Sequence, residues 1–158
     1  GLSADRTVLT GCAKVGEVQQ AARKLDVQAT RDLINMGDKR LLVFACSPFF
    51  EADQLIIESL SKSLENMPNA RLGVRLHPTA KPGYPEYIEG LAQQKPSVFV
   101  LGQLDLPQTL IAADILITRF SNLGLEAALL GKDVITCNFN DGIVPIRLDE
   151  MGVSTVAC

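Results

Sequence analysis

The sequence predicts an α/β protein, a three-layer Rossmann-like domain on a mostly parallel sheet of about six strands. Short, nearly continuous apolar runs, as expected of strands buried on both faces, alternate along the chain with segments of helical apolar spacing. Such alternation implies right-handed crossovers and helices on both sheet faces. The 158 residues, of which 47% are hydrophobic and 21% charged, are enough for one domain with a sizeable core.

The first strand-helix-strand unit begins after Lys39-Arg40. The apolar run over 41–46 is the first strand, and Ser47-Pro48 starts the loop after it. Apolar residues at helical spacing then mark a helix: Ile56, Leu60, Leu64 and Met67. Pro68-Asn69 ends that helix, and the next strand covers 72–76, before His77-Pro78.

The same unit repeats along the rest of the chain. A loop rich in proline and glycine precedes a helix expected over 86–94, and Pro107 is well placed as the first residue of a helix that extends to 113. Gly131 can end a third helix, over 122–130, in the left-handed conformation. The strands of this half are expected over 97–101, 114–118, 134–137 and 153–157.

The first 38 residues have a different pattern. A brief β-like run covers 7–10, and one long amphipathic stripe then predicts a connecting helix packed on the domain; the stripe consists of Val15, Val18, Ala22, Leu25, Ala29, Leu33 and Met36. We therefore divide the chain into 1–38, a strand with a connecting helix, and 39–158, the Rossmann-like domain.

Composition excludes several functional classes. The net charge of -3 argues against a general nucleic-acid binder, and no apolar run approaches the roughly 20 residues that span a bilayer. The first residues do not show the pattern of a signal peptide, which is a basic segment followed by an apolar block. The cysteines (12, 46, 137 and 158) form no CxxC pair, and His77 is the only histidine, so we expect no zinc site. We expect the cysteines to be reduced core residues of a cytoplasmic protein.

Polar residues and glycines follow the predicted strands, where ligands bind in such sheets. In chain order these strand-end groups are Ser47-Pro48, Arg75 with His77-Pro78, Gly102-Gln103, Arg119 to Asn122, and Asn138 to Asp141. The strand ends contain no Asp-x-Asp pair, and we expect no metal and no cofactor. His77 can donate to a diphosphate or, alternatively, bond to a loop carbonyl.

The turn into the helix over 122–130 is the strongest candidate. Ser121, Asn122 and Gly124 lie at a helix N-terminus, where N–H groups and the helix dipole attract anions, and Gly124 would let the backbone approach a diphosphate. Glu126, one turn in, could accept from a ribose diol. Alternatively, Ser121 or Asn122 only caps the helix and Glu126 only favours its positive end.

Three segments carry a resemblance to known families. Ala113-Asp114-Ile115, with Ser121 to Ala127 and Gly131 to Ile135, resembles the donor-binding motif of GT-B glycosyltransferases, especially capsule and surface-polysaccharide synthesis proteins, CDP-glycerol glycerophosphotransferases and UDP-N-acetylglucosamine 2-epimerases. Arg75-Leu76-His77-Pro78 is similar to their K-x-H-P segment, and Val8 to Lys14 resembles the segment that leads into the second GT-B domain.

Three departures qualify this resemblance. Asp133 stands where many members have proline, and Arg119 stands where an aspartate is frequent. The Arg119 cation could face phosphate or lie on the surface. The loop over 139–141 lacks the D-Q-x-x-N pattern of many antibiotic and lipid glycosyltransferases, so the resemblance does not indicate which sugar is transferred.

The resemblance implies one half of a GT-B fold: residues 1–38 as the interdomain strand and connecting helix, and 39–158 as the nucleotide-sugar-binding domain. It implies a substrate-binding set with no assigned catalytic residue: Ser47, Arg75, His77, Gly102, Arg119, Ser121, Asn122, Gly124 and Glu126. The function implied is donor binding, UDP- or CDP-linked, in a glycosyltransferase of surface polysaccharide or glycoconjugate synthesis. A separate N-terminal domain would bind the acceptor and could associate peripherally with a membrane.

Two alternatives remain open. One is a nucleotide-sugar 2-epimerase-like domain, and the other is a non-catalytic Rossmann-like module that binds a nucleotide or a protein. A dinucleotide oxidoreductase is disfavoured, because no G-x-G-x-x-G follows the first strand.

Overall fold

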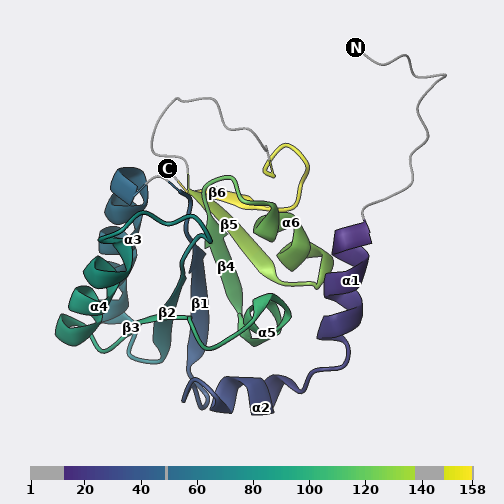
Figure 1. Ribbon diagram of the computed structural model, residues 1–158, viewed down its shortest axis with the longest axis horizontal. Helices are drawn as coiled ribbons and strands as arrows, with labels where there is room; N and C mark the ends of the chain where they lie inside the picture. Colours follow the sequence, from purple (N-terminus) through teal and green to yellow (C-terminus); the bar gives the residue numbers. More distant parts are fainter. Residues whose placement is uncertain (1–12, 49, 138–147, 158) are drawn as a thin grey trace.

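Six parallel strands form a single sheet in the order β3-β2-β1-β4-β5-β6 (Figure 1). The computed structural model describes residues 13–48, 50–137 and 148–157. The strands are β1 (Arg40–Ala45), β2 (Ala70–Arg75), β3 (Val98–Val100), β4 (Ile115–Thr118), β5 (Asp133–Cys137) and β6 (Thr155–Ala157). The chain builds outward from β1 to β3, then returns beside β1 and builds outward again from β4. The sheet therefore has its topological switch point between β1 and β4.

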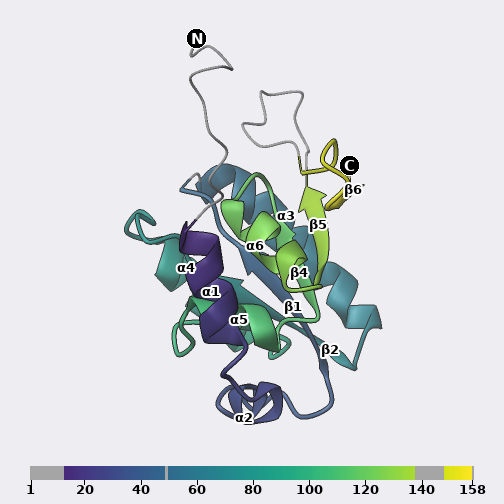
Figure 2. The same cartoon turned by 90° about the vertical axis from the view of Figure 1, so that its right-hand side faces the viewer.

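Helices cover both faces of this sheet. On one face lie α3 (Phe50–Ser63), which continues into a 3-10 turn (Leu64–Asn66), and α4 (Tyr84–Gln94). The other face carries α1 (Ala13–Ala22), α5 (Leu106–Ala112) and α6 (Asn122–Leu129), which face the viewer in Figure 2. The short α2 (Val27–Asp32) packs against α5 near the amino ends of the strands. The predicted three-layer Rossmann-like architecture is confirmed.

Strand β1 shows why its sequence is apolar without interruption. Leu41, Val43 and Ala45 belong to the core cluster under α1, α5 and α6. Their neighbours Leu42 and Phe44 belong to the cluster under α3 and α4. Because helices cover both faces of the sheet, the residues that face either side are buried, and the strand shows no alternation of apolar and polar residues.

Local signals set most of the element boundaries. Pro107 lies in the first turn of α5, where Asp105 and Gln108 form a capping box that the sequence analysis overlooked. Gly131 follows α6 with φ +73°, in the left-handed conformation expected of it. The strands and helices from β1 onward are thereby confirmed to within a few residues.

The amphipathic stripe over 15–36 forms two helices, α1 and α2, rather than the single helix expected. The Asp26 side chain accepts from the Ala29 N–H at 2.8 Å and so caps a new helix. Val18, Ala22 and Met36 of the stripe are buried as expected, whereas Ala29 and Leu33 are exposed. After the break, Ile34 rather than Leu33 packs in the same cluster as β1. The strand expected over 7–10 lies outside the described residues.

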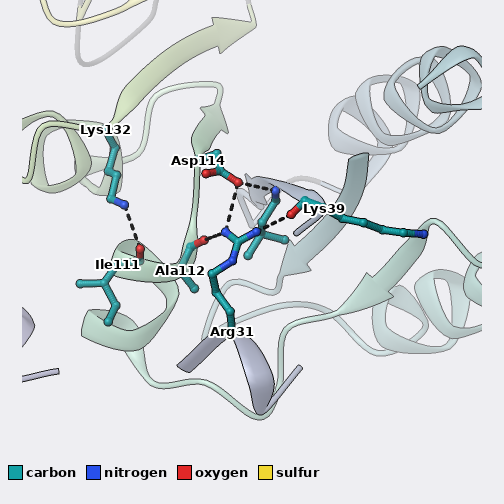
Figure 3. A network of polar contacts seen from close by, with 7 residues as sticks. Arg31, Lys39, Ile111, Ala112, Asp114 and Lys132 are labelled. Carbon is teal, nitrogen blue, oxygen red and sulfur yellow. Dashed lines mark hydrogen bonds and ion pairs between the residues drawn. The ribbon is translucent and has the colours of Figure 1, made fainter. Parts of the chain in front are cut away.

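A polar network fastens α2 to the amino ends of β1 and β4 (Figure 3). The Arg31 guanidinium donates to the Ala112 carbonyl at 2.8 Å, to Asp114 at 3.2 Å and to the Lys39 carbonyl. Asp114 also accepts the Leu41 N–H at 2.7 Å. The Asp of the Ala-Asp strand start therefore joins two strands and a helix at the end of the sheet that lies opposite the strand carboxyl ends.

Candidate functional site

A pocket of about 390 Å³ lies beyond the carboxyl ends of β1, β2 and β4, at the switch point. Its lining includes two thirds of the substrate-binding set expected from the sequence: Ser47, Arg75, His77, Ser121, Asn122 and Glu126. Cys46, Pro48 and Phe120 are among the other residues that line it. The fold therefore brings together groups that are up to 79 residues apart in sequence, from Ser47 to Glu126 (126 − 47).

The β1 side of the pocket is held by a buried carboxylate that the sequence analysis missed. Asp53, in the first turn of α3, is fully buried. It accepts the Ser47 backbone N–H at 2.5 Å, the Ser47 hydroxyl at 2.9 Å and the Tyr84 hydroxyl at 3.0 Å. Burial raises the pKa of Asp53, and these hydrogen bonds, with the Arg119 charge, oppose the rise. An acidic residue in a helix's first turn was the only sequence signal.

The β2 side contributes Arg75 and His77. Arg75 Nη1 donates to the Leu104 carbonyl at 3.0 Å and to Thr109 Oγ1 at 2.8 Å, so this cation also ties β2 to α5. Burial lowers the pKa of Arg75. His77 Nδ1 accepts the Thr79 N–H at 3.2 Å. Nδ1 also lies 2.8 Å from the Thr79 hydroxyl, and which of these two atoms donates depends on the ring tautomer. In the tautomer that carries its proton on Nε2, Nε2 is a donor.

The β4 side is the N-terminus of α6. Ser121 caps the helix, because its hydroxyl accepts the Leu123 N–H at 3.2 Å, and its own N–H donates to Thr118 Oγ1 at 3.2 Å. The capping role considered for Ser121 is thus confirmed, and it leaves the helix terminus facing the pocket. Asn122 is exposed, whereas Glu126 is only 4% exposed and lines the pocket one turn further on.

Three residues of the expected set do not line this pocket. Gly102 is exposed in the loop after β3. Arg119 Nη1 lies 3.9 Å from Asp53, and the guanidinium stacks over the Phe120 ring at 5.1 Å from its centroid. Gly124 is buried against the core, where an added Cβ would lie 2.4 Å from Leu148 Cδ1.

The chemistry that this pocket offers is binding. It combines a helix N-terminus, cationic and neutral donors and one carboxylate, which suit a phosphate and a diol. Burial raises the pKa of Cys46 to about 12, so this thiol stays protonated and is no nucleophile near neutrality. Within the described ranges, no group of three or more His, Cys, Asp or Glu could hold a metal, and no helix is long and apolar enough to cross a membrane.

Solved structures resemble this domain. The wall teichoic acid polymerase TagF, from a CDPG soak, matches 89% of this chain at 16% identity and TM-score 0.59. Anabaena HepE in complex with UDP and glucose matches 83% at 17% identity and TM-score 0.59. WaaG, a glycosyltransferase involved in lipopolysaccharide biosynthesis, matches 82% at 22% identity and TM-score 0.55. The chain has the fold of a GT-B glycosyltransferase C-terminal-like domain.

The chain spans about a third of the length of those structures: 34% of TagF, 38% of HepE and 36% of WaaG. No protein-family model matches the sequence, and no curated protein matches it either. The similarity therefore rests on three-dimensional structure.

Proposed function

We propose that this domain binds the nucleoside-diphosphate sugar donor of a glycosyltransferase of surface polysaccharide or glycoconjugate synthesis. One observation carries the proposal: strand-end residues expected from the sequence to bind such a donor line one pocket at the switch point. HepE, of the same fold, was solved with UDP and glucose, and TagF with CDPG. We therefore expect a UDP- or CDP-linked donor.

Each part of the donor has a matching group in the pocket. The diphosphate lies at the N-terminus of α6, where Ser121 is the N-cap, Asn122 is the first helical residue and the helix dipole favours negative charge. His77 and Arg75 supply further donors from the β2 side. Glu126 accepts hydrogen bonds from the ribose diol, because a buried carboxylate makes strong charge-assisted bonds with hydroxyls.

Catalysis in this proposal is electrostatic. As the sugar leaves, negative charge develops on the diphosphate, and the fixed donors at the end of α6 stabilise it without reorganising. A second, N-terminal domain binds the acceptor and supplies the base that activates it. Residues 1–38 would connect that domain to the nucleotide-binding unit, 39–158. That domain could also provide peripheral membrane contact. A cytoplasmic location fits the buried Cys46 and Cys137, neither of which forms a disulfide.

Isothermal titration calorimetry tests the binding claim. UDP should bind at least about tenfold more tightly than uridine, and CDP more tightly than cytidine, since only the diphosphate reaches the α6 terminus. Equal or absent binding within both pairs would remove the phosphate site.

A second assay addresses the division of labour. The 158-residue chain should bind a UDP-sugar without turning it over, because two-domain closure supplies orientation and excludes water. Hydrolysis or epimerisation at enzyme-like rates would contradict the two-domain account, and epimerisation would favour the epimerase alternative.

A further inference from the structure

The loops that form the two main walls of the pocket leave the sheet in opposite directions. The β1 and β4 strands are paired up to Ala45 and Thr118. Beyond that pair, the chain after β1 enters α3 on one face, whereas the chain after β4 enters α6 on the other (Figures 1 and 2). Backbone pairing between β1 and β4 therefore does not extend to these walls.

Asp53 links them. Its Oδ2 accepts the Ser47 N–H at 2.5 Å, and its Oδ1 accepts the Ser47 hydroxyl at 2.9 Å, which fixes the wall after β1. Its Oδ1 also lies 3.9 Å from Nη1 of Arg119, which directly precedes the Phe120–Ser121 wall after β4. Arg119 in turn stacks on Phe120, which lines the pocket. The Tyr84 hydroxyl adds a third contact, from the first turn of α4.

We propose that Asp53 is the positioning residue of this pocket, joining the Ser47 wall to the Phe120–Ser121 wall across the switch point. The inference rests on the proposed function for its ligand, a nucleoside diphosphate. Asp53 does not line the pocket, so it acts through Ser47 and Arg119 rather than on the ligand.

The chemistry of the contacts makes this role specific to a carboxylate. All four groups around Asp53 can donate to it, and an ionised carboxylate offers acceptors on both oxygens. Asparagine offers one acceptor oxygen. The Ser47 and Tyr84 hydroxyls can reverse and accept from its amide, but the Ser47 backbone N–H and the Arg119 guanidinium cannot. Asp53→Asn therefore loses either the Ser47 N–H bond or the Arg119 contact, and either loss weakens the link that holds the two walls together.

The chain contains a matched control at the other end of the sheet. Asp114 likewise accepts a backbone N–H, that of Leu41, and pairs with an arginine, Arg31 (Figure 3). Asp114→Asn removes the same kinds of interaction but leaves the pocket untouched.

Hydrogen exchange of the unliganded chain, read by mass spectrometry, is combined with calorimetry of UDP and CDP. In Asp53→Asn we expect faster exchange in both 46–48 and 119–121, unchanged exchange in β1 and β4, and about tenfold weaker diphosphate binding. Asp114→Asn should leave both the exchange in 46–48 and 119–121 and the diphosphate affinity unchanged. Faster exchange on one wall only, or unchanged affinity in a folded variant, would overturn the proposal.

Two further outcomes are informative. If the wild-type chain binds neither UDP nor CDP, the proposed function fails, whereas the exchange data still decide whether Asp53 couples the walls. If Asp53→Asn does not fold, Arg119→Gln replaces it, because Arg119 is partly exposed. That variant should speed exchange at 119–121 and also at Ser47, and unchanged exchange at Ser47 would refute the coupling.

Discussion

Gly124 and Leu148 are in direct packing contact: a Cβ built on Gly124 would lie 2.4 Å from Leu148 Cδ1. Thr118 Cγ2 and Val134 Cγ1, each 3.4 Å from the same point, close the space from β4 and β5. Leu148 is fully buried and cannot move aside freely. The absence of a side chain at Gly124 thus lets α6 pack closely on the sheet, which places the helix N-terminus at the pocket.

Gly124→Ala should therefore lower the free energy of unfolding by about 1–3 kcal/mol, the usual cost of overpacking. Helix propensity alone would favour alanine by roughly 1 kcal/mol, so the sign of the change in unfolding free energy shows whether packing or propensity dominates. Gly90→Ala, in α4, is the control, because an added Cβ there meets nothing within 4 Å and should be neutral or stabilising. Urea unfolding of both variants decides, and a stabilised Gly124→Ala would contradict the packing account.

Glu126→Gln should weaken nucleoside-diphosphate binding by about 1.5–3 kcal/mol, the range for hydrogen bonds to charged groups. The amide keeps the shape but loses the charge and one acceptor oxygen. If Glu126 only favours the helix dipole, stability falls by about 0.3–1 kcal/mol and affinity is unchanged. Unfolding midpoints and dissociation constants, measured on the same two proteins, separate these patterns.

Arg75→Lys should reduce both stability and affinity. A lysine cannot reproduce the planar guanidinium that contacts the Leu104 carbonyl and Thr109 while it lines the pocket, and we expect a loss of about 1–2 kcal/mol in stability. Arg71→Lys, at the amino end of the same strand, is the control: Arg71 stacks on Phe99, away from the pocket. Arg71→Lys should leave UDP affinity unchanged. Equal losses of affinity in the two variants would argue against a role for Arg75 in the pocket.

Cys46 should make stability depend on pH in the alkaline range. Burial raises its pKa from 9.0 to about 12, so the unfolded chain releases the thiol proton first. The contribution of the protonated thiol to the free energy of unfolding is fully present below the pKa of Cys46 in the unfolded chain. It is lost as pH rises toward the pKa in the folded chain, by up to about 1.4 kcal/mol per pH unit. The difference in unfolding free energy between the wild type and Cys46→Ala should shrink from pH 8 to pH 10. A constant difference would show that the thiol is not desolvated.

The sheet was predictable because its strands are short apolar runs buried on both faces, as β1 shows. The pocket was predictable because parallel strands end at one edge, which brings Ser47, His77 and Ser121 together. These features depend on local sequence and on general topology.

Asp53, by contrast, was missed, because its partners Ser47, Tyr84 and Arg119 are set around it only by tertiary packing. Gly124 gives the same sequence signal whether a ligand or Leu148 occupies the space beside it. The break between α1 and α2 was also missed, because the apolar stripe continues past the Asp26 cap.

The central claim, that the pocket at the switch point binds a nucleoside diphosphate, is tested most directly by residue-resolved NMR of the labelled chain during titration with UDP or CDP. We expect the largest amide shift changes at Ser47, His77 and Ser121 to Glu126. None of comparable size is expected at the opposite end of the sheet, at Arg31 and Asp114 (Figure 3) or at Leu41, which donates to Asp114. Shift changes that cluster at that opposite end, or none with either nucleotide at millimolar concentration, would contradict the account.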